Sequence, residues 1–125
     1  MLINLKNFEK CPQFDEDYFL YYEDFDFCRR YIKQGHKIAI TKTISVIHQP
    51  SSITNKKPEL KLEYSIYSYL LSLEKHTNKL VLIYRLLRIT IGALFYLPIN
   101  YKIAGAKLKA IGKFIRYNRR LGRTK

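Results

Sequence analysis

The stretch that decides how this chain folds is Phe19-Leu-Tyr-Tyr-Glu-Asp-Phe-Asp-Phe-Cys-Arg-Arg30, in which aromatic residues lead into three acids and two arginines. Acidic side chains at the start of a helix offset its exposed N–H groups and the positive end of its dipole. We therefore predict a helix over residues 24–34, with Glu23 or Asp24 at its N-terminal end and Gly35 directly after its last turn. Carboxylates gathered at this point suit either a helix cap or a catalytic site.

Short extended segments are expected on both sides of this helix. Residues 14–22 read as an acidic turn followed by a buried, aromatic, extended run. Residues 37–41 and 44–48 are apolar runs of strand length, and His48 ends the second one. The Pro, Ser and Asn content of residues 50–58 predicts a loop.

Three helical patterns follow, over residues 59–74, 80–97 and 101–121. The middle one is apolar on almost every side, which is typical of a helix buried in protein or lipid. Its length of about 27 Å falls just short of the hydrocarbon core of a bilayer. Arg85 and Arg88 would each cost about 2.5–3.5 kcal/mol at the bilayer centre. We therefore favour a helix lying in the membrane interface, with a true span as the alternative.

The last pattern, residues 101–121, predicts an amphipathic helix with a basic face opposite an aliphatic and aromatic one. Such a composition is typical of an interfacial membrane helix, where each basic group contributes about 1 kcal/mol near an anionic leaflet. The alternative is a helix that packs against the domain and leaves its charged face in water. The predicted membrane-binding residues are Arg85, Arg88, Lys109, Lys113, Arg116 and Arg120.

The charge is distributed unevenly along the 125 residues, which are enough for one domain. Residues 1–74 hold ten basic and ten acidic side chains, whereas residues 75–125 hold thirteen basic side chains and no acid. This asymmetry predicts an anionic partner for the second segment, either nucleic acid or a membrane surface. No nucleic-acid-binding motif is present, so the apolar run favours the membrane. Cys11 and Cys28 lack a metal-binding spacing, and we expect two reduced thiols in a protein without a secretory signal.

The order of residues over 14–52 is similar to the C-terminal portion of family 2 glycosyltransferases, most closely the bacterial rhamnosyltransferase and galactofuranosyltransferase-like branch. The similarity rests on Phe14-Asp-Glu, the aromatic stretch, Glu23-Asp-Phe-Asp26, the arginines, Gly35 and Val46-Ile-His48. The basic tail is also similar to the C-terminal helix of that branch, which is a weaker signal.

The resemblance implies an α/β fold, namely an incomplete GT-A fragment with an acceptor-side helix and short strands, followed by two or three amphipathic and basic C-terminal helices. Residues 1–58 would form the acceptor-side segment with the catalytic base. Residues 59–125 would form a helical extension that associates with the cytoplasmic face of the cell membrane.

The resemblance also implies roles for single residues. Asp24 would be the general base that takes the proton of an acceptor hydroxyl as this attacks the anomeric carbon of a nucleotide-sugar, with inversion. Glu23 would bind the acceptor, a polysaccharide or a lipid-linked glycan. Asp26, with Arg29 and Arg30 one turn later, would support the site structurally.

A divalent cation, Mg²⁺ or Mn²⁺, would carry the donor diphosphate in such an enzyme, with His48 completing its coordination. Each role has a simpler alternative: Asp24 as a helix cap, and His48 as a hydrogen-bonded core residue. We expect His36 and His76 at the surface.

The nucleotide-binding half of such enzymes, with its Asp-x-Asp metal motif, has no counterpart ahead of Phe14. Asp15-Glu-Asp17 and Asp24-Phe-Asp26 have these letters but belong to the acceptor-side segment. We therefore expect a C-terminal portion that is inactive without that half, which a separate chain would supply. The alternatives are a non-catalytic basic protein that binds membrane or nucleic acid, and a non-catalytic remnant that folds poorly.

Overall fold

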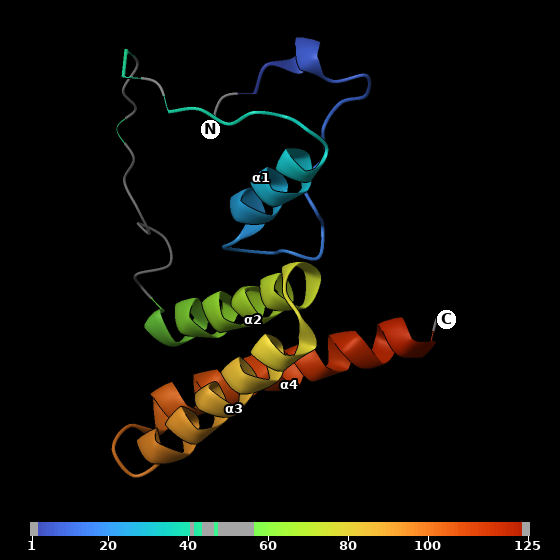
Figure 1. Ribbon diagram of the computed structural model, residues 1–125. Helices are drawn as coiled ribbons and strands as arrows, with labels where there is room; N and C mark the ends of the chain where they lie inside the picture. The colour runs from blue at the N-terminus through green and yellow to red at the C-terminus, as the bar shows by residue number, and fades with distance from the viewer. Residues whose placement is uncertain (1–2, 41, 44–46, 48–56, 124–125) are drawn as a thin grey trace.

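The computed structural model describes residues 3–40, 42–43, 47 and 57–123. Its elements are a short 3-10 helix η1 (Leu5–Asn7) and four α-helices, α1 (Glu23–Lys33), α2 (Pro58–His76), α3 (Lys79–Tyr96) and α4 (Tyr101–Arg123). Figure 1 shows that α1 and its flanking segments lie on one side of α2, and that α3 and α4 lie on the other side. Over the described residues the fold is helical and contains no strand, so the strands of the expected α/β class are not seen.

The three C-terminal helices are confirmed, and local sequence signals explain where they begin. Pro58 opens α2 at a position where its fixed φ suits the first turn and its missing N–H costs nothing. The side chain of Asn78 accepts a hydrogen bond from the backbone N–H of Val81 at 2.9 Å and caps α3. Asn100 caps α4 in the same way through the N–H of Ile103, at 3.2 Å.

Helices α2 and α4 run in the same direction, and α3 runs back between their ends (Figure 1). Ion pairing between Glu59 and Lys102 marks the start of both helices, and Lys75 lies over the ring of Tyr117 farther along both. Alanines on α4 allow the three helices to approach closely, since Ala104 and other alanines are fully buried. The core cluster consists of Leu70, Leu82, Ile111 and Phe114, with Ile66, Tyr67, Leu73, Leu86 and Ile89 packed against it.

Helix α1 begins at Glu23, one residue before the predicted range, and the predicted acids stand in its first turn. Its N-cap is Tyr22, which makes no side-chain capping bond, so neither Glu23 nor Asp24 is the cap residue. Tyr21 and Tyr22 both have positive φ, 67° and 66°, so the end of the predicted extended run is a tight turn. Of that run only Tyr18 is buried.

The end of helix α1 confirms the predicted glycine. Gly35 has a φ of 92° directly after the C-cap. The N–H of His36 donates to the carbonyl of Tyr31 and the N–H of Gly35 donates to the carbonyl of Ile32, both at 3.0 Å. These two bonds form a Schellman motif, in which glycine adopts the left-handed conformation without a Cβ clash.

The segment predicted as the first strand has no regular structure over residues 37–40. Ile38 and Ile40 are 53% and 96% exposed, so the apolar run neither pairs with a neighbour nor enters the core. A strand is stable only beside another strand, and none is available among the described residues. The second predicted strand, 44–48, lies outside the described residues except for Ile47.

Candidate functional site

Asp26 is the buried centre of the acidic stretch. Its side chain is completely buried, and its two carboxylate oxygens face different partners. Oδ2 accepts a hydrogen bond from Nε of Arg30 at 2.7 Å, and Oδ1 lies 2.7 Å from Nε2 of His76. A buried carboxylate is costly unless it is paired and hydrogen-bonded, and both conditions are met here. Asp26 therefore joins the first turns of α1 to the last turn of α2.

Arg30 connects the same carboxylate to the N-terminal segment. Besides its bond to Asp26, it donates a hydrogen bond from Nη2 to the carbonyl of Gln13 at 2.9 Å. Burial acts to lower the pKa of Arg30, but the hydrogen bond and charge of Asp26 outweigh it and raise the pKa. Arg29, the other candidate partner, lies instead with its guanidinium 5.9 Å from the centre of the Phe25 ring.

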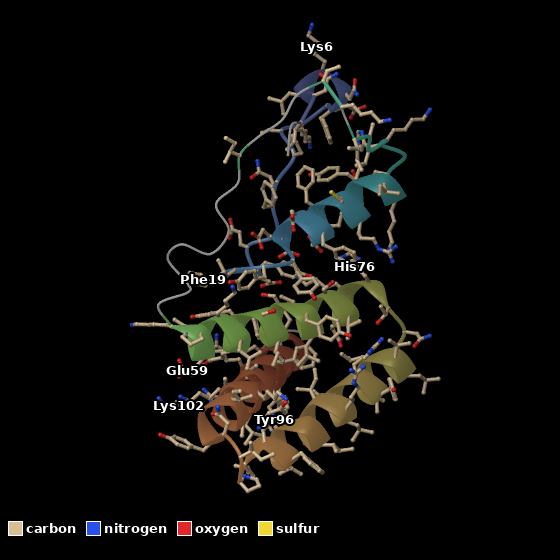
Figure 2. All side chains as sticks on the ribbon, turned by 90° about the vertical axis from the view of Figure 1, so that its left-hand side faces the viewer. Lys6, Phe19, Glu59, His76, Tyr96 and Lys102 are labelled. Carbon is tan, nitrogen blue, oxygen red and sulfur yellow. The ribbon has the colours of Figure 1, made fainter. Side chains whose placement is uncertain are left out.

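His76 was missed by the sequence analysis, which placed it at the surface. Its side chain is only 5% exposed, because α1 covers the last turn of α2 (Figure 2). The edge of the Phe25 ring also faces it, with centroids 6.1 Å apart. A signal was present in the sequence: Ser68, Ser72 and His76 recur every four residues, and both serines are buried. Small residues at this spacing mark the side of α2 that another segment approaches closely.

Asp24 differs from Asp26 in being exposed. One of its oxygens, Oδ1, accepts a hydrogen bond from the backbone N–H of Phe25 at 2.8 Å. Glu23, one residue earlier, is half-buried, and its Oε2 is buried without a hydrogen-bond partner in the described part of the chain. The first turn of α1 thus presents one solvent-facing carboxylate and one with an unused acceptor oxygen.

The two other acids of the N-terminal segment are already engaged. Nζ of Lys75 lies 2.6 Å from a carboxylate oxygen of Asp15 and 2.6 Å from one of Asp17. The hydroxyl of Tyr117, on α4, donates to Oδ2 of Asp17 at 2.5 Å. Burial acts to raise the pKa of Asp17, but these hydrogen bonds outweigh it and lower the pKa. Asp15 and Asp17 therefore attach the N-terminal segment to α2 and α4.

Burial and the hydrogen bond to Asp17 raise the pKa of Tyr117 to about 12. Burial opposes protonation of Lys75, but hydrogen bonds to Asp15 and Asp17 outweigh it and raise the pKa of Lys75. The contacts of this cluster are therefore favoured at neutral pH, with Asp17 ionised, Lys75 charged and the phenol of Tyr117 neutral.

The predicted metal ligand, His48, lies outside the described residues, so the structure does not place it relative to Asp24. Among the described residues, no three or more His, Cys, Asp or Glu side chains come together as metal ligands. Metal binding by His48 stays a prediction from the resemblance.

Helix α3 is apolar on two opposite sides. One side carries Leu82 and Ala93 into the core. The other side is exposed, and we call it the outer face of α3; it consists of Leu80, Ile83, Tyr84, Leu87, Ile91, Leu94 and Phe95. Arg85 and Arg88 stand beside this face, Arg85 half-buried over the ring of Tyr84 and Arg88 exposed. No helix in the described part of the chain is both long and apolar enough to cross a membrane.

Helix α4 uses its apolar side inside the protein. Ile111 and Phe114 are buried between α2 and α3, so α4 packs on the other helices as the alternative describes; membrane binding by its basic face stays a prediction. Lys113 also turns inward, with Nζ 2.6 Å from Oε1 of Glu63. Lys109 and Arg116 are exposed. The predicted basic face thus keeps most of its cations in solvent.

Comparisons of the chain with protein-family models, with curated proteins and with solved structures find no match.

Proposed function

We propose that this chain forms the acceptor-side, membrane-associated part of an inverting glycosyltransferase. The observation that carries the proposal is the difference in burial between two carboxylates in the first turn of α1. Asp26 is fully buried and holds the helix in place, whereas Asp24 is exposed two residues earlier on the same rigid support. A general base must be fixed in position and yet open to its substrate, and Asp24 meets both requirements.

In the proposed step, the carboxylate of Asp24 accepts the proton of an acceptor hydroxyl while the oxygen forms a bond to the anomeric carbon of the donor sugar. The bond from that carbon to the nucleoside diphosphate breaks, and the diphosphate leaves with the electron pair. Glu23 is the acceptor-binding residue that the resemblance predicts; its Oε2 is buried without a hydrogen-bond partner in the described residues, so a sugar hydroxyl reaches it only after the side chain turns outward. Donor binding belongs to a nucleotide-binding half, with a divalent cation for which His48 is the predicted ligand from this chain.

The catalytic proposal is tested by sugar transfer. The chain is co-expressed with a nucleotide-binding half of the same branch, and transfer of label from a nucleotide-sugar to the membrane lipid and polysaccharide fractions is measured. Asp24→Asn removes the base with little change of shape, and Glu16→Gln is the matched control at an exposed acid outside the first turn. Loss of transfer in the first variant alone supports the proposal, and equal activity of both variants contradicts it.

The membrane part of the proposal rests on the outer face of α3. Its exposed apolar residues lie along one side of the helix over its whole length, and contiguous apolar surface of this kind marks interaction sites. The occupant we propose is an anionic membrane at the cytoplasmic side of the cell. Arg85 and Arg88 stand beside the face, and residues 75–125 contain no acid, so a second copy of the same surface would be repelled by like charge.

Vesicle binding tests the membrane part with the chain alone. Co-sedimentation is measured with vesicles containing phosphatidylglycerol and with neutral phosphatidylcholine vesicles. Binding that requires the anionic lipid and weakens when Leu87 becomes Gln supports the proposal. Binding to DNA or RNA that is lost with salt, without vesicle binding, would favour a nucleic-acid-binding protein instead.

A further inference from the structure

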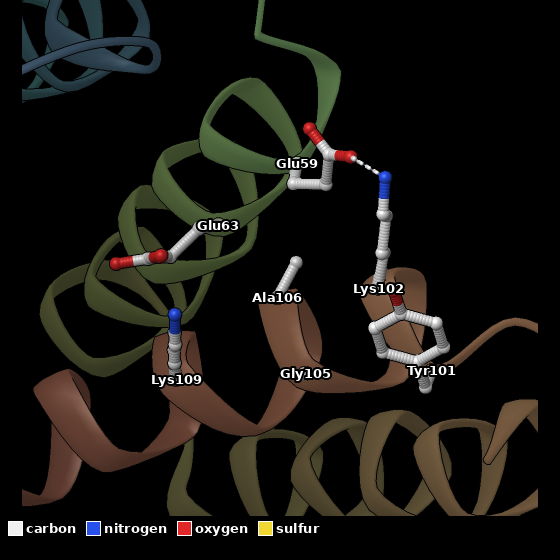
Figure 3. Close-up of a pocket in the computed structure, with 7 residues that line it drawn as sticks. All are labelled: Glu59, Glu63, Tyr101, Lys102, Gly105, Ala106 and Lys109. Carbon is white, nitrogen blue, oxygen red and sulfur yellow. Dashed lines mark ion pairs between the residues drawn. The ribbon is translucent and has the colours of Figure 1, made fainter.

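A pocket lies between the first turns of α2 and α4, away from α1. Its volume is about 310 Å³, and it is lined by charged residues of both helices together with Tyr101, Gly105 and Ala106. Figure 3 shows Lys102 and Lys109 of α4 on either side of Ala106, below Glu59 and Glu63 of α2. Because α2 and α4 run in the same direction, the positive ends of both helix dipoles also point to this end of the molecule.

The charges in the pocket are not fully paired with one another. Glu63 is 11% exposed and is paired at 2.6 Å with Lys113, which does not line the pocket. Glu59 and Lys102 are 3.9 Å apart, with side chains 44% and 60% exposed, which makes a weak pair that a ligand can open. Lys109 makes no ion pair in the described part of the chain. Two ammonium groups and one carboxylate are therefore available to a ligand.

Gly105 leaves space for that ligand. A Cβ atom built on Gly105 would meet nothing within 4 Å, so the backbone between Lys102 and Lys109 faces open space. These two lysines are seven residues apart, which is about two turns, and lie on the same side of α4. An anion between them would be approached by both ammonium groups without steric hindrance from the helix.

The pocket opens beside an apolar tip formed by the turn between α3 and α4. Phe95, Ile99 and Tyr101 are 74%, 70% and 72% exposed, and Leu97 is also exposed. Tyr101 belongs both to this tip and to the wall of the pocket. A group bound in the pocket would therefore lie at the level where an inserted tip leaves the lipid and enters water.

We propose that this pocket binds the headgroup of a phospholipid, with the phosphate between Lys102 and Lys109 and with Glu59 accepting a hydrogen bond from an ammonium group such as that of phosphatidylethanolamine. The inference rests on the proposed membrane association and adds the lipid that is recognised. In this arrangement the phosphate pairs with the two lysines, the ammonium group pairs with the carboxylate, and the acyl chains contact the apolar tip.

Titration with a soluble lipid tests the pocket without a bilayer. Dihexanoyl-phosphatidylethanolamine, below its micelle concentration, is added to the ¹⁵N-labelled full chain, and the amide signal of Gly105 is followed. Dihexanoyl-phosphatidylcholine and inorganic phosphate are the comparison probes. Saturable shifts at Gly105 that are largest with the ethanolamine lipid are expected, because the choline group cannot donate a hydrogen bond. Equal shifts with inorganic phosphate would overturn the lipid assignment.

Two variants distinguish binding in the pocket from general attraction by the positive charge of the protein. Lys102→Met should weaken binding of the ethanolamine lipid about fivefold or more, the effect of about 1 kcal/mol from a charged contact, and Arg119→Met at an exposed cation of the same helix should not change it. Gly105→Leu fills the pocket on an open helix surface, and in this variant the amide signal of Ala106, which also lines the pocket, should no longer shift while the fold is kept. Binding that survives Gly105→Leu overturns the inference. Lipid binding in the pocket without vesicle co-sedimentation would contradict the membrane proposal alone.

Discussion

Nε2 of His76 lies 2.7 Å from Oδ1 of Asp26, a carboxylate that is completely buried and fifty residues earlier in the chain. Together with Arg30, this contact offsets the cost of burying the Asp26 carboxylate, the only fully buried acid of the described residues. It also fixes the direction of α1, because it connects the first turns of that helix to the last turn of α2. The position of Asp24 therefore depends on His76, although the two side chains belong to different parts of the sequence.

Removal of either His76 or Asp26 should destabilise the protein strongly. In His76→Ala, the Asp26 carboxylate keeps only Arg30, and we expect a loss of about 1–3 kcal/mol in the free energy of unfolding. In Asp26→Ala, Arg30 and His76 both lose their partner, and the loss should be about 3–5 kcal/mol. Asp24→Ala is the matched control on the same helix turn and should cost much less. Urea unfolding followed by circular dichroism measures all three, and equal losses for Asp24→Ala and Asp26→Ala would show that burial does not separate their roles.

The cluster of Asp15, Asp17, Lys75 and Tyr117 should make stability depend on pH in a defined way. Burial acts to raise the pKa of Asp17, but its hydrogen bonds hold the pKa below the ordinary value of 3.8. Its contribution is therefore present above that value and is lost as the pH falls through the lowered pKa. The pKa of Lys75 is raised above 10.5, so its contribution is present below that value and is lost only as the pH rises through the raised pKa.

The comparison of wild type with Lys75→Met isolates this effect. The difference in melting temperature should be constant from about pH 5 to about pH 9 and should shrink as the pH falls below 3.8 and through the lowered pKa of Asp17. Lys79→Met, at an exposed lysine at the start of α3, provides the control for removal of a charge. A difference that persists unchanged at acid pH would mean that Lys75 stabilises the protein through packing of its aliphatic side-chain atoms and not through its ion pairs with Asp15 and Asp17.

The outer face of α3 should determine vesicle binding without affecting the fold. Leu87 and Phe95 are 56% and 74% exposed, so Leu87→Gln and Phe95→Ser remove apolar surface that the described part of the chain leaves mostly in solvent. Transfer of either side chain into lipid contributes about 1.5–3 kcal/mol to the free energy of binding. Each variant should therefore bind anionic vesicles at least about tenfold more weakly. Unchanged vesicle binding by both variants would exclude this face as the docking surface.

Phe114→Ser is the contrasting variant for that experiment. Phe114 is 3% exposed and belongs to the core between the three C-terminal helices. Its replacement should lower the melting temperature, and any effect on vesicle binding should follow the loss of folded protein. The melting curves of Leu87→Gln and Phe95→Ser should instead match that of wild type.

The sequence predicts the helices of this fold well and its tertiary contacts less well. Caps and breaks such as Pro58, Asn78 and Gly35 act locally, so they place the helix ends within a few residues. The run at residues 37–40 has the composition of a strand, but composition does not supply the neighbouring strand that it would need. Periodicity identifies the apolar side of α4 correctly, yet it cannot show whether protein or lipid covers that side.

The candidate site likewise has one part that the sequence predicts and one part that only the packing of the helices shows. The spacing of Asp26 and Arg30 is a local signal for an ion pair across one turn, and the structure contains that pair. The contact with His76 comes from the packing of α1 on α2, and only the serines at every fourth position of α2 hint at it. His48 lies outside the described residues, so its role stays a prediction.

The rate of sugar transfer by Asp24→Asn tests the central claim most directly. Wild type and variant are each co-expressed with the nucleotide-binding half, and kcat and KM for the acceptor are measured beside circular dichroism spectra and melting curves. If Asp24 is the general base, kcat should fall by about 10²–10⁴-fold with little change in KM and with the fold intact. Asp24→Asn with the kcat of wild type would contradict the account.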